Sequence, residues 1–170
     1  IDEIKLTREK LKLFNQVITA KGASLANCWG CIDGTARPIC RPKTHKRVVF
    51  SGHKRIHCLK FQSVVTPDGT IANLFGPIEE RRHDSGILFN SRMSSVRVCA
   101  EWVFVKIIQI FAFLDLKKKK KNLKLYLQSV GKAYIVGTLL TDCHTCLYGS
   151  ATSDYFNCLS LPKLDKYFRM

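Results

Sequence analysis

The chain has 170 residues, 46% of them hydrophobic, which fits one domain with a modest core. Its 28 Lys and Arg residues outnumber 13 Asp and Glu residues, so the formal net charge is +15. This excess favours a polyanionic partner, most commonly nucleic acid; a basic chain whose charge serves only solubility is the alternative. No run of 18 apolar residues occurs, which excludes a membrane-spanning helix.

The cysteines and the start of the chain bear on the compartment. Eight cysteines without a secretory signal predict reduced thiols in the cytosol or nucleus. The sequence begins at Ile1 rather than Met, which is consistent with a fragment.

The cysteines also form two CxxC pairs, Cys28 with Cys31 and Cys143 with Cys146, whose four thiolates would suffice for structural zinc. The pairs lie far apart in the sequence, so zinc is a minor alternative, and a redox site is a weaker one.

An amphipathic helix is predicted first, in TREKLKLFNQVITAKG, with Thr7 as N-cap and Gly22 as the stop. Its apolar residues recur at helical spacing: Leu11, Phe14, Val17 and Ile18. The next segment, CWGCIDGT, is a short apolar run that is typical of a buried strand. In this interpretation Asp33 lies at the C-terminal end of the strand.

Two more strands are predicted after a basic stretch. RPKTHKRVVFSGHKR indicates a loop or a rough hairpin. IHCLKFQSVV then alternates as a strand does, TPDGT indicates a tight turn, and IANLFGPI is the returning strand. Together with the first strand, these segments predict a three-stranded meander.

The second half of the chain has helical spacing. SSVRVCAEWVFVKIIQIFAFL has Ser94 or Ser95 as N-cap and carries Glu101. Its predicted apolar side comprises Val96, Cys99, Val103, Phe104 and Ile107. The lysine run at residues 117–121 ends this helix, and LKLYLQSVGKAYIVGTLLTDCHTCLYG is a second apolar helical stretch. The tail is expected to dock through Leu159, Leu161, Leu164 and Tyr167 or Phe168.

Three carboxylates are candidates for chemistry, because a buried ionised group must be paired, hydrogen-bonded or metal-bound. Asp33, Asp84 and Glu101 could converge as oxygen ligands for Mg²⁺, the arrangement that suits two-metal phosphoryl transfer. Each also has a structural alternative: Asp33 caps a turn, Asp84 pairs with a neighbouring Arg or His, and Glu101 is an ordinary helix-surface acid. The lysine run is a nuclear-import patch, a phosphate contact or a solvated linker.

Four ordered blocks resemble the DDE superfamily endonuclease domain of Harbinger-type transposases and their domesticated nuclease relatives. The blocks are CWGCIDGTARPICRP, VVFSGHKRIHCLKFQSVVTPDGTIANLFGPIEERRHDSGIL, FNSRMSSVRVCAEWVF and NLKLYLQSVGKAYIVGTLLTDCHTCLYG. The resemblance covers about residues 25–168, with residues 1–24 as a separate N-terminal helix.

The resemblance implies an RNase H-like α/β (α+β) fold, in which a mixed sheet flanked by helices gathers three acids around divalent metal, Mg²⁺ or Mn²⁺, to cut DNA. Asp33 matches the first catalytic and metal-binding acid of the family, and Glu101 matches the last. Between Leu88 and Phe89, however, the family has a segment that contains a helix, a central strand and the second catalytic aspartate. Asp84 is the candidate for a substitute metal ligand.

We therefore expect a truncated RNase H-like fold, with a three-stranded meander plus flanking helices. The expected function is a transposon-derived, DNA-directed, metal-binding DDE-type endonuclease-like protein whose catalysis is impaired. The alternatives are a non-enzymatic DNA- or protein-binding remnant and a gene fragment without a stable fold. The expected nucleic-acid-binding residues are Arg37, Arg41, Lys43, Lys46, Arg47, Lys54 and Arg55. The resemblance also implies a Myb/SANT-like DNA-binding partner and location in the nucleus, with the cytoplasm as a further location.

Overall fold

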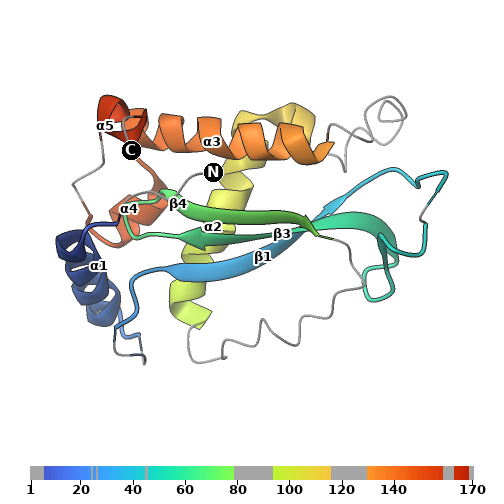
Figure 1. The fold of residues 1–170 in the computed structure, drawn as a ribbon. Helices are drawn as coiled ribbons and strands as arrows, with labels where there is room; N and C mark the ends of the chain where they lie inside the picture. Colours follow the sequence, from blue (N-terminus) through green and yellow to red (C-terminus); the bar gives the residue numbers. More distant parts are fainter. Residues whose placement is uncertain are drawn as a thin grey trace.

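The computed structural model describes residues 6–23, 25, 27–44, 46–78, 94–115, 130–158 and 163–168. It combines a small antiparallel sheet with helices, so the α/β (α+β) fold class is confirmed (Figure 1). The elements, in chain order, are α1 (Arg8–Ala20), β1 (Cys31–Pro38), β2 (Phe50–Ser51), β3 (Ile56–Val65), β4 (Ile71–Ile78), α2 (Ser94–Ile110), the 3-10 helix η3 (Ala112–Leu114), α3 (Val130–Tyr148), α4 (Ala151–Tyr155) and α5 (Leu164–Phe168).

Strand β3 is the centre of the sheet, because β1, β2 and β4 each pair with it. The β1–β3 register runs from Cys31 opposite Val65 to Pro38 opposite Cys58, and β4 pairs with the other side of β3. The predicted meander of three strands is confirmed, and the basic stretch contributes only the two-residue β2. All pairs among the described strands are antiparallel, so this part of the chain lacks the mixed sheet that the resemblance implies.

The position of Asp33 within its strand differs from the prediction. Asp33 is the third residue of β1 and lies near its start, not at its C-terminal end. The Asp33-Gly34 pair does not form a turn, because β3 supplies a pairing partner for every residue of β1 as far as Pro38. The interpretation of Asp33 as a turn cap is therefore wrong.

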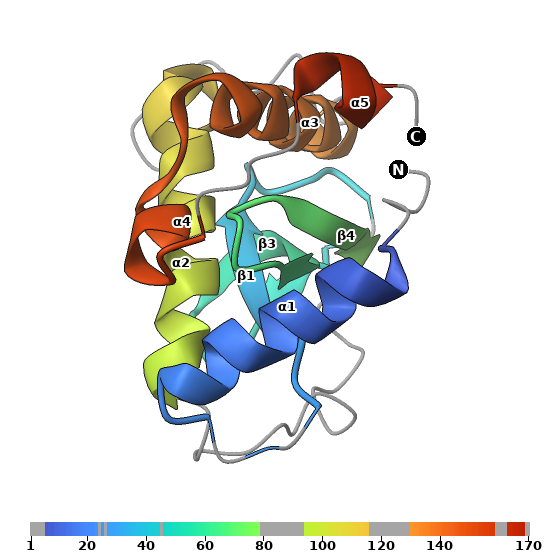
Figure 2. The same ribbon diagram turned by 90° about the vertical axis from the view of Figure 1, so that its left-hand side faces the viewer.

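The helices pack mainly on one face and one end of the sheet. Helix α2 lies behind β1 and β3, while α3 runs across the top beside β4 (Figure 1). Helix α1 crosses the end of the sheet where β1 begins and β3 ends (Figure 2). None of the helices in the described ranges is long and apolar enough to cross a membrane.

The hydrophobic core forms between the sheet and these helices. Its buried members include Phe14 and Ile18 of α1, Phe61 and Val65 of β3, and residues of α2. The α2 members are Cys99, Ala100, Val103, Phe104 and Ile107, four of which were predicted to face inward; the Val96 side chain lies outside the described residues. The N-cap prediction for α1 is also confirmed, because Thr7 Oγ1 accepts a hydrogen bond from Lys10 N at 3.4 Å.

The opposite face of the sheet keeps hydrophobic side chains in contact with solvent. Ile32 is 46% exposed and Phe75 is 56% exposed. Both project away from the core, because their cross-strand neighbours Val64 and Gln62 alternate with the buried residues of β3. No strand among the described residues pairs with the outer edge of β1.

The turn between β3 and β4 is held against the segment that links α3 to α4. Gly69 has a φ of +82°, a conformation that costs an L-residue about 1–2 kcal/mol. A Cβ atom at this position would collide with Ser150 Oγ, which caps α4 by accepting a hydrogen bond from Ser153 N. The turn therefore requires glycine for both its backbone conformation and its packing.

We expect Gly69→Ala to lower the free energy of unfolding by roughly 2 kcal/mol or more, because backbone strain and a displaced helix cap add together. Gly52→Ala is the matched control, since no atom lies within 4 Å of the position that its Cβ would take. Urea unfolding of both variants measures the difference. Equal stability of the two variants would contradict this account of the turn.

Candidate functional site

The predicted carboxylates Asp33 and Glu101 lie on elements that pack against each other. Asp33 is half-buried on β1, and Glu101 is exposed on α2. The strand and the helix meet where the thiol of Cys31 contacts that of Cys99, and where Arg37 donates a hydrogen bond to the Phe104 carbonyl at 3.1 Å. Asp33 lies between the two contact points along the strand. Glu101 lies between them along the helix but on its exposed side, so the packing brings the two elements together without burying Glu101 beside Asp33.

The cross-strand neighbour of Asp33 is an unsatisfied hydroxyl. Ser63 lies directly opposite Asp33 in the register and is fully buried. Directly opposite residues share a face of the sheet, so both side chains project toward α2. Ser63 Oγ has no hydrogen-bond partner among the described residues. A buried unsatisfied hydroxyl is uncommon in a folded protein.

The remaining candidate ligands do not complete this set. The described ranges contain no group of three or more His, Cys, Asp or Glu side chains that could hold a metal ion. Asp84 and the lysine run at 117–121 lie outside the described residues.

The two CxxC pairs do not come together as a shared zinc site, because no three Cys, His, Asp or Glu side chains of the described residues are grouped to hold a metal ion. Cys31 is buried, and both its contact with Cys99 and its burial raise the pKa of its thiol. Cys143 and Cys146 lie on α3, and burial raises the pKa of each. All eight cysteines are among the described residues, and none of them forms a disulfide.

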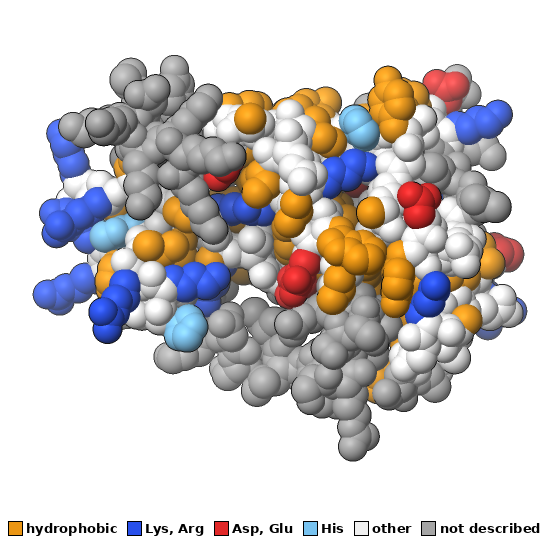
Figure 3. Space-filling view, turned by 180° about the vertical axis from the view of Figure 1, so that it is seen from behind, with side chains coloured by type: hydrophobic (Ala, Val, Ile, Leu, Met, Phe, Trp, Pro, Cys, Tyr) orange, Lys and Arg blue, Asp and Glu red, His pale blue; other side chains and the backbone are white. Residues whose placement is uncertain are grey.

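Six of the seven predicted nucleic-acid-binding residues form an exposed basic surface. We call this group the basic end: Arg41, Lys43, Lys46, Arg47, Lys54 and Arg55. They lie in and beside the segment that connects β1 to β3, and Figure 3 shows Lys and Arg side chains gathered at that left-hand end of the molecule. The group can contact phosphates without any rearrangement of the fold.

Arg37, the seventh predicted residue, lies in the interface between the sheet and the helices. Its guanidinium donates to Tyr134 Oη at 3.0 Å as well as to the Phe104 carbonyl, and it lies 5.0 Å from the Tyr134 ring centroid. These contacts join β1 to α2 and α3. Arg37 therefore has a structural role, and its role in nucleic-acid binding stays a prediction.

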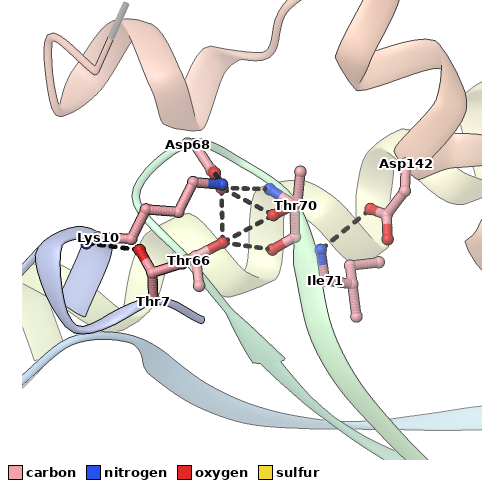
Figure 4. Close-up of polar contacts among 7 residues, drawn as sticks. All are labelled: Thr7, Lys10, Thr66, Asp68, Thr70, Ile71 and Asp142. Atoms are coloured by element: carbon pink, nitrogen blue, oxygen red, sulfur yellow. Dashed lines mark hydrogen bonds and ion pairs between the residues drawn. The ribbon is translucent and has the colours of Figure 1, made fainter. Parts of the chain in front are cut away.

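A second group of polar residues, which sequence reasoning missed, surrounds the β3–β4 turn (Figure 4). Asp68 is 1% exposed, and its Oδ1 accepts hydrogen bonds from Thr66 Oγ1, Thr70 N and Thr70 Oγ1 at 2.6, 3.1 and 2.8 Å. Lys10 of α1 lies 3.9 Å from Asp68 Oδ2. The TPDGT motif indicated a turn, but nothing in it indicated that the aspartate would be buried.

Asp142 connects this turn to the C-terminal helices. Its Oδ1 accepts a hydrogen bond from Ile71 N at 3.0 Å, and its Oδ2 accepts one from Tyr167 Oη at 2.9 Å. The Tyr167 contact confirms that the tail docks through this residue. Burial raises the pKa of Asp142 to about 7, and the charge of Asp68 adds to the shift. The hydrogen bonds from Ile71 and Tyr167 and the charge of Lys106 oppose it.

Part of the chain is similar to a known protein family. Residues 32–91, about a third of the 170 residues, match the DDE superfamily endonuclease family. The matched stretch includes Asp33 and the three meander strands, and it ends before α2. It supports a transposase-derived, nuclease-like domain. No curated protein and no solved structure shows significant similarity to the chain.

The raised pKa of Asp142 predicts a specific pH dependence of stability. Between about pH 4 and pH 7 the folded state keeps a proton on Asp142 that the unfolded state releases, so this group stabilises the fold less as pH rises. Asp142→Asn removes the titration but keeps an acceptor for Ile71 N and a group that can bond to Tyr167. Its stability relative to wild type should rise by roughly 2 kcal/mol between pH 5 and pH 8.

Urea unfolding at both pH values measures this change, with Asp165→Asn as the control because Asp165 is exposed on α5. Parallel pH profiles for wild type and Asp142→Asn would show that Asp142 does not titrate differently in the folded protein.

Proposed function

We propose that this chain is a transposon-derived, DNA-directed DDE-type endonuclease-like protein in which metal binding is weakened and cleavage is impaired. The observation that carries the proposal is the family match over residues 32–91, which includes Asp33 on β1. The packing of α2 against β1 supports it, because it brings together the two elements that carry Asp33 and Glu101.

The residues around Asp33 only partly fit the divalent metal that DDE endonucleases use. Asp33 and Glu101 are the carboxylates that the resemblance assigns to the site, but only Asp33 lies within the matched residues 32–91. Ser63 Oγ is an unsatisfied oxygen beside Asp33. Two-metal hydrolysis requires ligands that place one ion at the attacking water and another at the leaving oxygen. Mg²⁺ also demands near-octahedral geometry and binds weakly to few carboxylates. These donors do not fit a two-metal centre, so we assign the chain no cleavage step.

DNA binding is proposed to rest on the basic end. Its six side chains are exposed, so each can approach a phosphate without losing a partner inside the fold. Contacts between Lys or Arg and phosphates position a protein on DNA but do not read its sequence. The formal net charge of +15 adds long-range attraction to any polyanion.

The proposed partners and location extend the same interpretation. We propose DNA as the ligand, a Myb/SANT-like DNA-binding protein as the partner that supplies sequence recognition, and the nucleus as the main location, with the cytoplasm as a further one. The second candidate function, a non-enzymatic DNA- or protein-binding remnant, is favoured by the incomplete ligand set around Asp33.

We expect DNA binding to be sequence-tolerant and to weaken steeply as salt rises, because neutralised phosphates release counterions. Changing Arg47, Lys54 and Arg55 to Gln should reduce the steepness of log K against log salt by up to about 3, since each lost phosphate contact removes about 0.9. Fluorescence anisotropy on two unrelated duplexes at several salt concentrations measures both effects.

The matched control changes Arg8, Lys12 and Lys163 to Gln, because these residues are exposed and their loss changes the net charge equally. Equal effects of the two triple variants would show that total charge, and not the basic end, determines binding.

Cleavage is expected to be absent or very weak in either Mg²⁺ or Mn²⁺, because the described carboxylates do not form a two-metal centre. A plasmid-nicking assay with the intact chain and with Asp33→Ala tests this expectation. Strong nicking by the intact chain that is lost in Asp33→Ala would show that cleavage is not impaired, and it would support Asp33 as a catalytic residue. Strong nicking that survives Asp33→Ala would refute the site itself.

A further inference from the structure

An exposed aromatic side chain lies among the cations of the basic end. Phe50 is the first residue of β2 and is 43% exposed. Arg47 precedes it in the chain, and the turn that contains Lys54 and Arg55 follows β2. Figure 3 shows hydrophobic and histidine side chains between the Lys and Arg side chains of this end. Single exposed apolar residues are common, so the surroundings of Phe50 matter more than its exposure.

The Phe50 ring is held against a histidine ring. Phe50 and His57 are directly opposite each other in the pairing of β2 with β3, so their side chains share a face of the hairpin. Their ring centroids are 5.2 Å apart, and the ring planes are inclined at 60°. Beside this pair, Ile39 N donates to the His57 carbonyl at 2.8 Å. Cys58 N donates to the Val49 carbonyl at the same distance. Phe50 is therefore exposed but restricted in orientation, and covering it costs little conformational entropy.

The turn between β2 and β3 presents two cations next to the ring pair. Ser51 is 1% exposed, and its Oγ accepts a hydrogen bond from Lys54 N at 3.3 Å, which fixes the start of the turn. Arg55 has a φ of +52°, a conformation that is uncommon for residues other than glycine. The side chains of Lys54 and Arg55 are both exposed. One pair of strand residues, Ser51 and Ile56, separates this turn from the rings, so the aromatic surface and the cations are adjacent.

No acidic side chain from this part of the sequence neutralises these cations. Residues 34–67 contain no Asp or Glu. Within the described ranges, the ion pair of Lys10 with Asp68 joins α1 to the β3–β4 turn, and no ion pair involves the basic end. The charge of the basic end is therefore available to an anion from outside the chain. A second copy would carry the same formal net charge of +15 and would be repelled.

An exposed aromatic ring among cations is the arrangement with which proteins bind unpaired nucleic-acid bases. Lys and Arg contact the phosphates, while the bases stack on the aromatic rings. The bases of a duplex are stacked on one another and present only their edges in the grooves, so a duplex can use the cations but not the ring. The ring at Phe50 thus favours an unpaired strand.

We propose that the basic end binds single-stranded DNA, with an unpaired base stacked on Phe50 and the adjacent phosphates bonded to Arg47, Lys54 and Arg55. This inference rests on the proposed DNA binding and specifies the state of the strand that the basic end prefers. Duplex DNA contacts the same cations without the ring.

The test compares two single strands that carry the same phosphates. One is an oligothymidine of about 12 nucleotides, and the other is an abasic strand of the same length. Both are measured by fluorescence anisotropy at one salt concentration, beside a duplex of the same length. We expect the chain to bind oligothymidine about tenfold more tightly than the abasic strand, which is the size of effect that one stacked base supplies.

Phe50→Ala and Phe50→Leu should each abolish the preference for oligothymidine, because neither residue offers an aromatic face. Both variants should bind the abasic strand and the duplex within about twofold of wild type, since these ligands use only the cations. Equal weakening of all three ligands would show that Phe50 has a structural role only, and would overturn the inference.

Tyr148→Ala is the matched control, because Tyr148 is another exposed aromatic residue paired with a histidine. It is 76% exposed, and its ring centroid lies 4.8 Å from that of His144. It is the last residue of α3, which ends near α5, at the opposite end of the molecule from the turn between β2 and β3 (Figure 1). This variant should keep the full preference for oligothymidine.

The remaining outcomes separate this inference from the proposed function. Equal binding of oligothymidine and the abasic strand, together with binding of the duplex, would overturn the inference and leave the proposed DNA binding intact. Failure to bind any of the three DNAs would overturn both. An oligoglutamate of equal charge is measured in parallel; if it binds as tightly as oligothymidine and Phe50→Ala weakens it equally, the ligand is an acidic peptide and the inference is wrong.

Discussion

The hairpin formed by β3 and β4 docks against the C-terminal helices through the buried carboxylate of Asp142. This residue lies on α3, binds the first backbone N–H of β4, and accepts a hydrogen bond from Tyr167 of α5. One side chain thus joins the sheet to two helices that are distant in the sequence. Because Ile71 is buried and its backbone N–H donates to Asp142, losing the carboxylate would leave a buried donor unsatisfied, which is more costly than losing an exposed contact.

The strands and most helices could be predicted because their signals are local. Alternation of apolar residues in 56–65, the TPDGT turn and the helical spacing of Phe14 and Ile18 depend only on neighbours in the chain. The end of β1 was misplaced because the Asp33-Gly34 pair normally marks a turn, whereas pairing with β3 extends the strand to Pro38. Long-range pairing here outweighs a local preference, and a sequence pattern contains no record of that pairing.

The candidate site was likewise predictable only in part. Resemblance to the family identified Asp33 and Glu101, and the structure places them on a strand and a helix in contact. The roles of Arg37 and Asp142 could not be read from the sequence, because each depends on partners on other elements: Phe104 and Tyr134 for one, Ile71 and Tyr167 for the other. A usable signal did exist for Asp142, since an acid inside an apolar helical stretch requires a partner.

The register of β1 has a consequence for how this gene can change. Side chains alternate between the two faces of a strand, so Asp33 and Arg37 face inward together only in the observed pairing with β3. A codon inserted or deleted between residues 33 and 37 would place these two side chains on opposite faces of the sheet. Point substitutions at solvent-facing positions such as Ile32 carry no such penalty. Descendants of this sequence should therefore vary in residue identity along β1 while its length stays constant.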